Sequence, residues 1–365
     1  MFISHLSADG FRNLKMSQVE LTQGINILYG NNAQGKTNFL EAVYFCAFGR
    51  SLRAASDKEL VFFDAQAAYI RTEIVRGGFR QTMDATIEKQ GTRATKSISV
   101  DRIPIKHMKD LFGRLLVVMF TPEDLRLIKS GPAERRRFMD MEICQLSPVY
   151  YGDLREYHRA LRQRNALLKI LQKDKSQVDS LSIWDEQLAN YGQRIIKTRK
   201  AFIGKVNDIA REIHGHITQS AEVLEVIYAP NIIYAENYLK DMSKSHRRDI
   251  AQGSTSHGVH KDDINFVING VSVRSFGSQG QQRTAALSAK LAEIEIIKQS
   301  TGEFPVLLLD DVFSELDSSR QKFLLSRIMD LQTIITCTGV EDILKSVEGC
   351  RIMKVDCGIV TFQQQ

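Results

Sequence analysis

The chain has 365 residues, 43% of them hydrophobic and 25% charged, and a formal net charge of +6. These proportions are typical of a soluble globular protein, and the length predicts two or three lobes. No apolar run could span a bilayer and no secretory leader is recognisable, which argues against membrane and secreted proteins. The five cysteines are scattered without a CxxC pair, so we expect a cytoplasmic protein with reduced thiols and no zinc site.

The first recognisable feature in chain order is a glycine-bounded loop between a strand and a helix. Residues 25–29 are a short apolar stretch, residues 38–45 carry apolar side chains at helical spacing, and residues 30–37 match GxxxxGK followed by Ser or Thr. Such a loop points backbone N–H groups at a phosphate, and the helix N-terminus adds partial positive charge. The pattern predicts a nucleoside triphosphate site whose contacts are Gly30, Asn31, Asn32, Ala33, Gln34, Gly35, Lys36 and Thr37.

The middle of the chain changes from β-rich to helical character. Residues 67–75, 80–87 and 96–100 are β-rich, and residues 115–120 form an apolar run that predicts a strand buried on both faces. From about residue 133 to 217 the apolar side chains recur at helical spacing on two faces. Two antiparallel helices joined by a short connection fit this pattern best.

Basic residues cluster in the predicted helical region. Lys and Arg groups lining a groove suit sequence-independent contact with a phosphodiester backbone, and the alternative is an ordinary solvated helix face. The sequence contains no helix-turn-helix, zinc finger or aromatic sheet motif for reading bases, so we expect recognition of DNA by shape. The candidate DNA contacts are Arg135, Arg136, Arg137, Arg159 and Arg162.

A second part of the triphosphate site is predicted near the C-terminus. An apolar strand at residues 306–309 ends in Asp310 and Asp311. A P-loop needs a carboxylate at the end of a neighbouring strand to hold Mg²⁺, and we assign Asp310 to this role together with the Thr37 hydroxyl. We assign Asp311 as the general base that polarises the attacking water, and Lys36 as the contact to the β- and γ-phosphates. Because loop and carboxylates are far apart in sequence, a large insertion must divide the nucleotide-binding sheet.

Another phosphate-binding pattern precedes that strand, at the start of a predicted helix over residues 279–299. Ser278, Gly280 and Gln281 would present a hydroxyl, a backbone N–H and an amide to an anion. Since the P-loop already holds the phosphates of its own ATP, we expect this helix start to contact the ATP of a partner subunit. The sequence therefore predicts an ATP-dependent homodimer.

The order of these motifs resembles the ABC-type ATPase family, with a P-loop, a helical lobe, a signature, a Walker B strand and a D-loop at residues 314–317. The resemblance implies an α/β fold, namely an ABC-type P-loop ATPase head with a mixed sheet and a helical lobe. Gln279 replaces the first signature glycine usual in transporters, and Asp311 replaces the usual glutamate, which suggests slow hydrolysis. The residues available in place of the switch histidine are Thr336, Cys337 and Thr338.

More narrowly, the chain resembles the RecF family of bacterial recombination mediators over essentially its full length. The motifs that carry this resemblance are Phe11-Arg12-Asn13 and residues 30–42, 49–51, 122–125, 131–140, 257–263, 278–284 and 307–317. The family implies ATP-driven dimerisation on DNA, weak DNA-stimulated ATPase activity, and cooperation with RecR and RecO in loading RecA at gaps and supporting the SOS response. We add Arg12 to the predicted nucleotide contacts.

The motifs suggest three segments: residues 1–120 as the N-terminal half of the ATPase, 121–255 as the helical lobe, and 256–365 as the C-terminal half. Two other functions remain open, an ABC transporter ATPase subunit and an ATP-gated nuclease of the overcoming-lysogenization type. His257 and His260 lie near two aspartates, but without a third His or Cys we prefer a polar loop to a metal site there.

Overall fold

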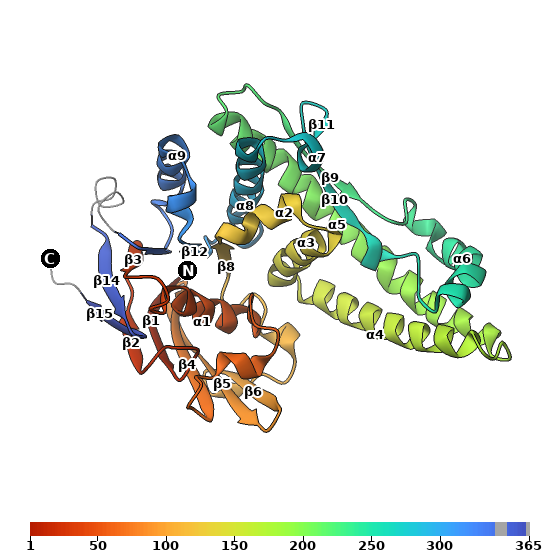
Figure 1. Cartoon of the computed structure of the whole chain (residues 1–365), viewed down its shortest axis with the longest axis horizontal. Helices are drawn as coiled ribbons and strands as arrows, with labels where there is room; N and C mark the ends of the chain where they lie inside the picture. The colour runs from red at the N-terminus through yellow and green to blue at the C-terminus, as the bar shows by residue number, and fades with distance from the viewer. Residues whose placement is uncertain (340–348, 363–365) are drawn as a thin grey trace. The chain divides into compact units, whose positions relative to one another are not determined.

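The computed structural model describes residues 1–339 and 349–362. It divides the chain into two compact units (Figure 1): unit 1 consists of Met1–Asp124 and Ile297–Gln365, and unit 2 of Leu125–Ile296. Residues 256–296, which the sequence motifs grouped with the C-terminal half of the ATPase, thus lie in unit 2, because their strands pair with a strand of that unit. The functional roles of the three predicted segments stay a prediction.

Unit 1 contains a six-stranded mixed sheet that carries the predicted P-loop. Its strand order is β15-β14-β3-β13-β12-β8, and all neighbours are parallel except the final hairpin of β14 and β15. Four of its strands are almost fully buried apolar runs, as expected for parallel strands covered on both faces. The strands are β3 (Ile25–Tyr29), β8 (Val117–Phe120), β12 (Val306–Asp310), β13 (Thr333–Cys337), β14 (Arg351–Asp356) and β15 (Ile359–Phe362).

A second, antiparallel sheet in unit 1 has the order β2-β1-β4-β5-β6-β7. Helix α1 (Lys36–Phe48) contacts strands of both sheets and is buried on nearly every side, which explains why its sequence is apolar all round. Helix α9 (Ser318–Ile328) follows β12. The second sheet comprises β1 (Phe2–Asp9), β2 (Ser17–Glu20), β4 (Ala67–Arg76), β5 (Phe79–Gln90), β6 (Arg93–Val100) and β7 (Ile103–Pro104).

Unit 2 is mainly helical. The helices α4 (Pro148–Leu171) and α5 (Leu181–Ile217) run along each other as an arm, which confirms the predicted antiparallel pair (Figure 1). The sequence analysis missed α6 (Tyr238–Gln252), which packs on α5, and β9 (Leu224–Ala229). The remaining elements are α2 (Arg126–Lys129), α3 (Pro132–Leu146), β10 (Asp263–Ile268), β11 (Val271–Ser272), α7 (Val273–Phe276) and α8 (Gln279–Thr301), whose last residues from Ile297 belong to unit 1.

The mixed sheet and the helical unit confirm the predicted α/β fold class. Strand β11 is short, because Val273 begins α7 directly after it. Among the described residues, no helix is long and apolar enough to cross a membrane.

Candidate functional site: a phosphate loop with paired carboxylates

The predicted P-loop connects β3 to α1, as its sequence requires. Two of its glycines have backbone angles that side chains disfavour, Gly30 at φ 155° and Gly35 at φ 116°. The Lys36 ammonium curls back and donates hydrogen bonds to the carbonyl oxygens of Gly30 (2.6 Å) and Asn31 (2.8 Å). Burial lowers the pKa of Lys36, and the nearby Asp311 carboxylate opposes that shift. The lysine side chain is thus held inside the loop by two backbone carbonyl groups.

Asp310 meets the P-loop helix directly. The hydroxyls of Thr37 and Thr336 each donate to Oδ1 of Asp310 at 2.8 Å, although Thr37 is 273 residues away in sequence. The parallel pairing of β13 with both β3 and β12 brings these strand ends to one edge of the sheet. A hydroxyl and a carboxylate oxygen at this spacing are the ligands that Mg²⁺ prefers.

Asp311, the predicted general base, has a left-handed backbone conformation with φ 52°. Its backbone N–H donates to the hydroxyl of Thr336 at 3.0 Å, so the end of β13 fixes its position. Of the three candidates for the switch position, Thr336 therefore contacts both aspartates. Burial raises the pKa of the Cys337 thiol to about 11, although the nearby Lys36 ammonium acts in the opposite direction. Thr338 is exposed.

Two segments from opposite ends of the chain support the P-loop, and the sequence analysis did not find this support. The Asn13 amide donates to the carbonyl of Ala33 (3.1 Å) and accepts from Asn38 (2.7 Å). The turn between β14 and β15 donates two backbone N–H bonds to Gln34, from Cys357 to its side chain (2.7 Å) and from Gly358 to its carbonyl (2.9 Å). We call the Cys357–Gly358 turn the C-terminal clamp.

Arg12, predicted to contact the nucleotide, lies beside the P-loop in an ionic cluster. Its guanidinium donates to both carboxylate oxygens of Glu41 at 3.0 and 3.2 Å, and Arg53 and Ser51 also donate to Glu41. Burial by itself raises the pKa of Glu41, but the hydrogen bonds from Arg12, Ser51 and Arg53 outweigh it and leave this pKa below its usual value. Arg12 and Arg53 also line a cavity of about 810 Å³ in unit 1.

The predicted signature residues Ser278 and Gln281 cap the start of α8 reciprocally. The Ser278 N–H donates to the Gln281 side chain at 2.9 Å, and the Gln281 N–H donates to the Ser278 hydroxyl at 3.2 Å, which is a capping box. The Gln281 amide also donates to Glu222 at 2.9 Å, and the other oxygen of Glu222 lies 3.0 Å from His214 on α5. Gly280 lies in the first turn of α8. The signature residue Gln281 is therefore connected to α5, the long helix of the arm, through Glu222.

The structure corrects part of the predicted DNA-contact set. Arg135 is 2% exposed and forms a two-pronged ion pair with Asp263, at 2.6 and 3.0 Å, so it is not a surface cation. Arg136 is partly buried and donates to the carbonyl of Asp262, and Arg137 is also partly buried.

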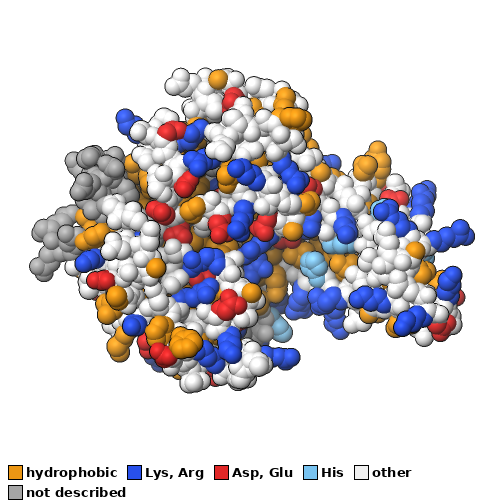
Figure 2. Space-filling view, in the orientation of Figure 1, with side chains coloured by type: hydrophobic (Ala, Val, Ile, Leu, Met, Phe, Trp, Pro, Cys, Tyr) orange, Lys and Arg blue, Asp and Glu red, His pale blue; other side chains and the backbone are white. Residues whose placement is uncertain are grey.

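Arg159 and Arg162, by contrast, lie on an exposed basic face of α4. Figure 2 shows Lys and Arg side chains gathered over the part of unit 2 that contains α4 and α6. The exposed basic residues of α4 and of the turn after it recur at helical spacing, and they are Arg155, Arg159, Arg162, Lys169 and Lys173. We call this set the α4 basic stripe.

His260, one of the two histidines near the aspartates, contacts polar groups of unit 2. His260 Nδ1 lies 2.8 Å from the Tyr157 hydroxyl, and its Nε2 lies 3.1 Å from the carbonyl of Thr255. In the described ranges 1–339 and 349–362, no three His, Cys, Asp or Glu side chains are grouped as metal ligands.

Comparisons with known proteins agree with this geometry. The family model described as RecF/RecN/SMC N terminal domain matches residues 2–361. A "DNA replication and repair protein RecF" from Lachnoclostridium phytofermentans is 46% identical over 99% of both chains, and one from Lachnospira eligens is 45% identical over 99% of both.

Solved structures are similar over the same length. Two described as the recombination mediator protein RecF with ATP or ATPrS in the RecFOR pathway have TM-scores of 0.92 and 0.91 and identities of 38% and 37%, and each comparison covers 100% of this chain and 98% of theirs. An Smc head domain from Pyrococcus furiosus has the same fold at 14% identity, with a TM-score of 0.57 and coverage of 99% of this chain and 96% of its own. By sequence and by fold, the chain belongs to the RecF family of DNA replication and repair proteins.

Proposed function

We propose that this protein is an ATP-dependent DNA-binding protein of recombinational repair and replication restart. The single observation that carries the proposal is the convergence of Thr37 and Asp310 at the mouth of a P-loop, in a chain of the RecF family. The relatives named RecF have solved structures described with ATP, which supports ATP as the ligand here. Full-length similarity to RecF favours this function over a transporter subunit or an ATP-gated nuclease.

The residues of the P-loop fit Mg²⁺ and the triphosphate of ATP. We propose that the backbone N–H groups of residues 30–37 and the Lys36 ammonium hold the phosphates, while Thr37 and Asp310 hold Mg²⁺. Bound Mg²⁺ would neutralise charge on the β- and γ-phosphates. Lys36 already points into the loop, and its two carbonyl contacts would be exchanged for phosphate oxygens.

The cavity beside Arg12 suits the nucleoside part of ATP. It holds about 810 Å³ and is lined by Asn13 and Asn38, which contact the P-loop, and by Phe62 and Phe63. Phe63 is 90% exposed, so its ring is accessible for packing against a base. We propose that the base and ribose lie in this cavity, with Arg12 on its phosphate side.

We propose that two copies of the chain bind ATP between them, with Ser278, Gly280 and Gln281 of one copy facing the phosphates in the P-loop of the other. The exposed Ser278 at the start of α8 supports this arrangement, because the partial positive charge of a helix N-terminus attracts anions. Asp311 would then polarise water for slow hydrolysis. The α4 basic stripe would contact the DNA backbone without reading its sequence.

Membership of the RecF family suggests the pathway and the partners of this activity. We propose weak DNA-stimulated ATPase activity in the cytoplasm, on single- or double-stranded DNA, with RecR and RecO as partners. In that pathway the protein would assist the loading of RecA at gaps and support SOS induction.

Sedimentation with and without ATP tests the proposed dimer. We expect ATP and Mg²⁺ to shift the protein from monomer to dimer, and the Ser278→Ala variant to lose this shift by about tenfold in dimer affinity while it keeps most of its ATP affinity. The reason is that, in this proposal, the Ser278 hydroxyl contacts the nucleotide of the partner and not the nucleotide of its own chain. Ser182→Ala is the matched control, because Ser182 lies near the start of α5 and its hydroxyl donates only to Asp179.

The same protein is then mixed with labelled duplex, single-stranded and gapped DNA at two salt concentrations. The proposal predicts tighter binding with ATP and a steep loss of affinity with added salt. A chain that stays monomeric with ATP, or that binds no DNA at low salt, would contradict it.

A further inference from the structure

Unit 2 contains a cavity of about 520 Å³ that the proposed ATP and DNA-backbone contacts do not use. It is bounded by residues 231–237, by one face of α6 and by His257. The lining residues of α6 recur at helical spacing, Asp241, Lys244, Ser245 and Arg248, so a single helix face forms one wall. The volume falls within the range of about 300–1,000 Å³ usual for small-ligand sites. We call it the α6 cavity.

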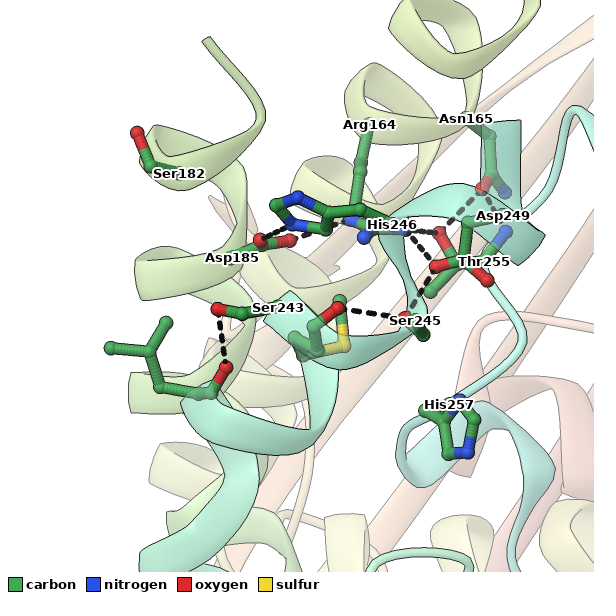
Figure 3. Close-up of polar contacts among 12 residues, drawn as sticks. Arg164, Asn165, Ser182, Asp185, Ser243, Ser245, His246, Asp249, Thr255 and His257 are labelled. Atoms are coloured by element: carbon green, nitrogen blue, oxygen red, sulfur yellow. Dashed lines mark hydrogen bonds and ion pairs between the residues drawn. The ribbon is translucent and has the colours of Figure 1, made fainter. Parts of the chain in front are cut away.

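A buried polar network fixes the floor of the α6 cavity (Figure 3). The fully buried Arg164 on α4 donates to Asp185 (2.7 Å), Asp249 (2.7 Å) and Thr255 (2.9 Å). The Ser245 hydroxyl, which lines the cavity, donates to Asp249 at 2.9 Å. Because Arg164 bonds to a carboxylate on α5 and to another on α6, these buried contacts hold α4, α5 and α6 in one arrangement.

His257, which also lines the cavity, belongs to the same network. Its Nδ1 lies 2.9 Å from the Ser256 hydroxyl, and that hydroxyl also donates to Asp249 at 2.6 Å. Figure 3 shows His257 apart from the Arg164 cluster, on the loop that precedes β10. Both the floor and the side are therefore preformed.

The rim of the α6 cavity combines aromatic, basic and amide groups. Tyr234 is 61% exposed, so one ring face is accessible. Arg248 has no ion pair anywhere in the described part of the chain, and Lys244 has only an exposed contact at 3.9 Å to Asp241. Two cations beside an open ring are the combination that binds a phosphate and an adjoining base.

We propose that the α6 cavity binds one nucleotide of single-stranded DNA, with the base against Tyr234 and its phosphate at Lys244 and Arg248. This inference rests on the proposed function in DNA repair and adds a second, structure-selective contact to the backbone contacts of α4. A base in a duplex is stacked on both faces, so only an unpaired nucleotide can lay its ring on Tyr234.

The amide and acidic groups favour a nucleotide over an acidic peptide. The amide of Asn237 and the amide N–H groups of Asn231 can pair with the edge of a base, while the Asn231 oxygen already accepts from the Gly258 N–H. The Asp241 carboxylate within the same wall would repel a run of carboxylates, but it can accept a hydrogen bond from the amino group of a base. The cavity therefore suits a ligand with a single negative charge next to a polar ring.

The test measures fluorescence anisotropy of a labelled oligothymidylate and a blunt duplex of equal length with the full chain. Tyr234→Ala should weaken binding of the oligothymidylate about tenfold and leave duplex binding within about twofold, because stacking on one ring is lost. Tyr234→Phe should keep wild-type affinity. An oligonucleotide that contains 5-iododeoxyuridine should crosslink under ultraviolet light to a peptide that contains Tyr234.

Arg248 and Arg247 provide a matched pair on α6. Both are exposed and carry the same charge, but only Arg248 lines the cavity. Arg248→Gln should weaken single-strand binding about tenfold, whereas Arg247→Gln should change it by less than about threefold.

Three results would overturn the inference: equal losses for Arg247→Gln and Arg248→Gln, equal losses for duplex and oligothymidylate in Tyr234→Ala, or displacement of the oligothymidylate by polyglutamate as efficiently as by unlabelled DNA. Each would leave the proposed function intact, since the wild-type chain would still bind DNA. A wild-type chain that binds no DNA would instead contradict the proposed function itself.

Discussion

At position 311 the backbone conformation, as well as the chemistry of the side chain, limits which residue fits. It has φ 52°, a conformation in which most side chains crowd their own backbone, and Asp and Asn tolerate it best among residues with a side chain. The glutamate usual at this position in ABC-type ATPases has a longer side chain, but it tolerates the left-handed backbone conformation less well than aspartate does. The aspartate keeps the carboxylate near Lys36 at little conformational cost.

Replacement of Asp311 should therefore slow ATP hydrolysis without weakening ATP binding. We expect Asp311→Asn to fold normally and bind ATP, but to hydrolyse it at least about 100-fold more slowly, because the general base is lost. Asp311→Glu should lower the free energy of unfolding by about 1 kcal/mol through the left-handed backbone. Phosphate release, nucleotide binding and thermal unfolding measure the three effects, and undiminished hydrolysis by Asp311→Asn would remove Asp311 from the proposed mechanism.

At the scale of the elements, the P-loop depends on segments distant in sequence. Gly358 of the C-terminal clamp packs so closely that an added Cβ would lie 1.8 Å from the carbonyl oxygen of Asn13. The backbone carbonyl of Gly358 itself accepts hydrogen bonds from the Lys15 N–H and the Ser17 hydroxyl. The clamp thus joins β15, the segment after β1 and the phosphate loop at one point.

Gly358→Ala should weaken ATP binding by about tenfold or more and lower the melting temperature, because the new methyl group would push the clamp away from Gln34. Gly78→Ala is the control, since Gly78 has the same φ of 82° but nothing within 4 Å of its added Cβ. The Gly78→Ala variant measures the backbone strain of a positive φ, about 1–2 kcal/mol, without the steric clash that Gly358→Ala adds. Equal ATP affinities for the two variants would show that the clamp does not support the loop.

The site residues differ in how far sequence reveals them. Lys36, Thr37 and Asp310 could be predicted, because a P-loop and a strand ending in aspartate are local patterns whose meeting follows from parallel sheet geometry. Arg135 and Arg164 could not, since nothing local distinguishes them from surface cations and only their pairing with Asp263, Asp185 and Asp249 buries them.

Some elements were hidden for a related reason. Helix α6 was missed because its sequence is mostly polar. Two of its four buried residues, Ser245 and Asp249, are polar as well, so they give no apolar signal. The C-terminal clamp was missed because its hydrogen bonds come from backbone N–H groups. Almost every residue type has such a group, so the sequence does not reveal these bonds.

For the molecule as a whole, buried histidines link stability to pH. Burial lowers the pKa of His260 from 6.5 to about 4, and burial also lowers the pKa of His158. Between these pH values the unfolded chain binds more protons at His260 than the folded chain does, so the free energy of unfolding rises with pH. The contribution of His260 is present above about pH 6.5 and is lost as the pH falls towards 4.

Denaturation at a series of pH values tests this linkage. We expect wild-type protein to lose up to about 3 kcal/mol between pH 6.5 and 4 through His260. His260→Gln, which can still bond Tyr157 and Thr255, should lose less over the same window while His158 maintains a residual slope. Parallel pH profiles for the two proteins would mean that folding does not change the pKa of His260.

The interleaved order of the mixed sheet also has a consequence for biosynthesis. The P-loop lies near the beginning of the chain, but β12, β13, β14 and the C-terminal clamp that flank and support it are among the last segments to be translated. A ribosome must release residues up to about 358 before the phosphate loop has its neighbours. A nascent or prematurely terminated chain would therefore lack these supports of the phosphate loop, and we expect it not to enter the proposed ATP-dependent assembly on DNA.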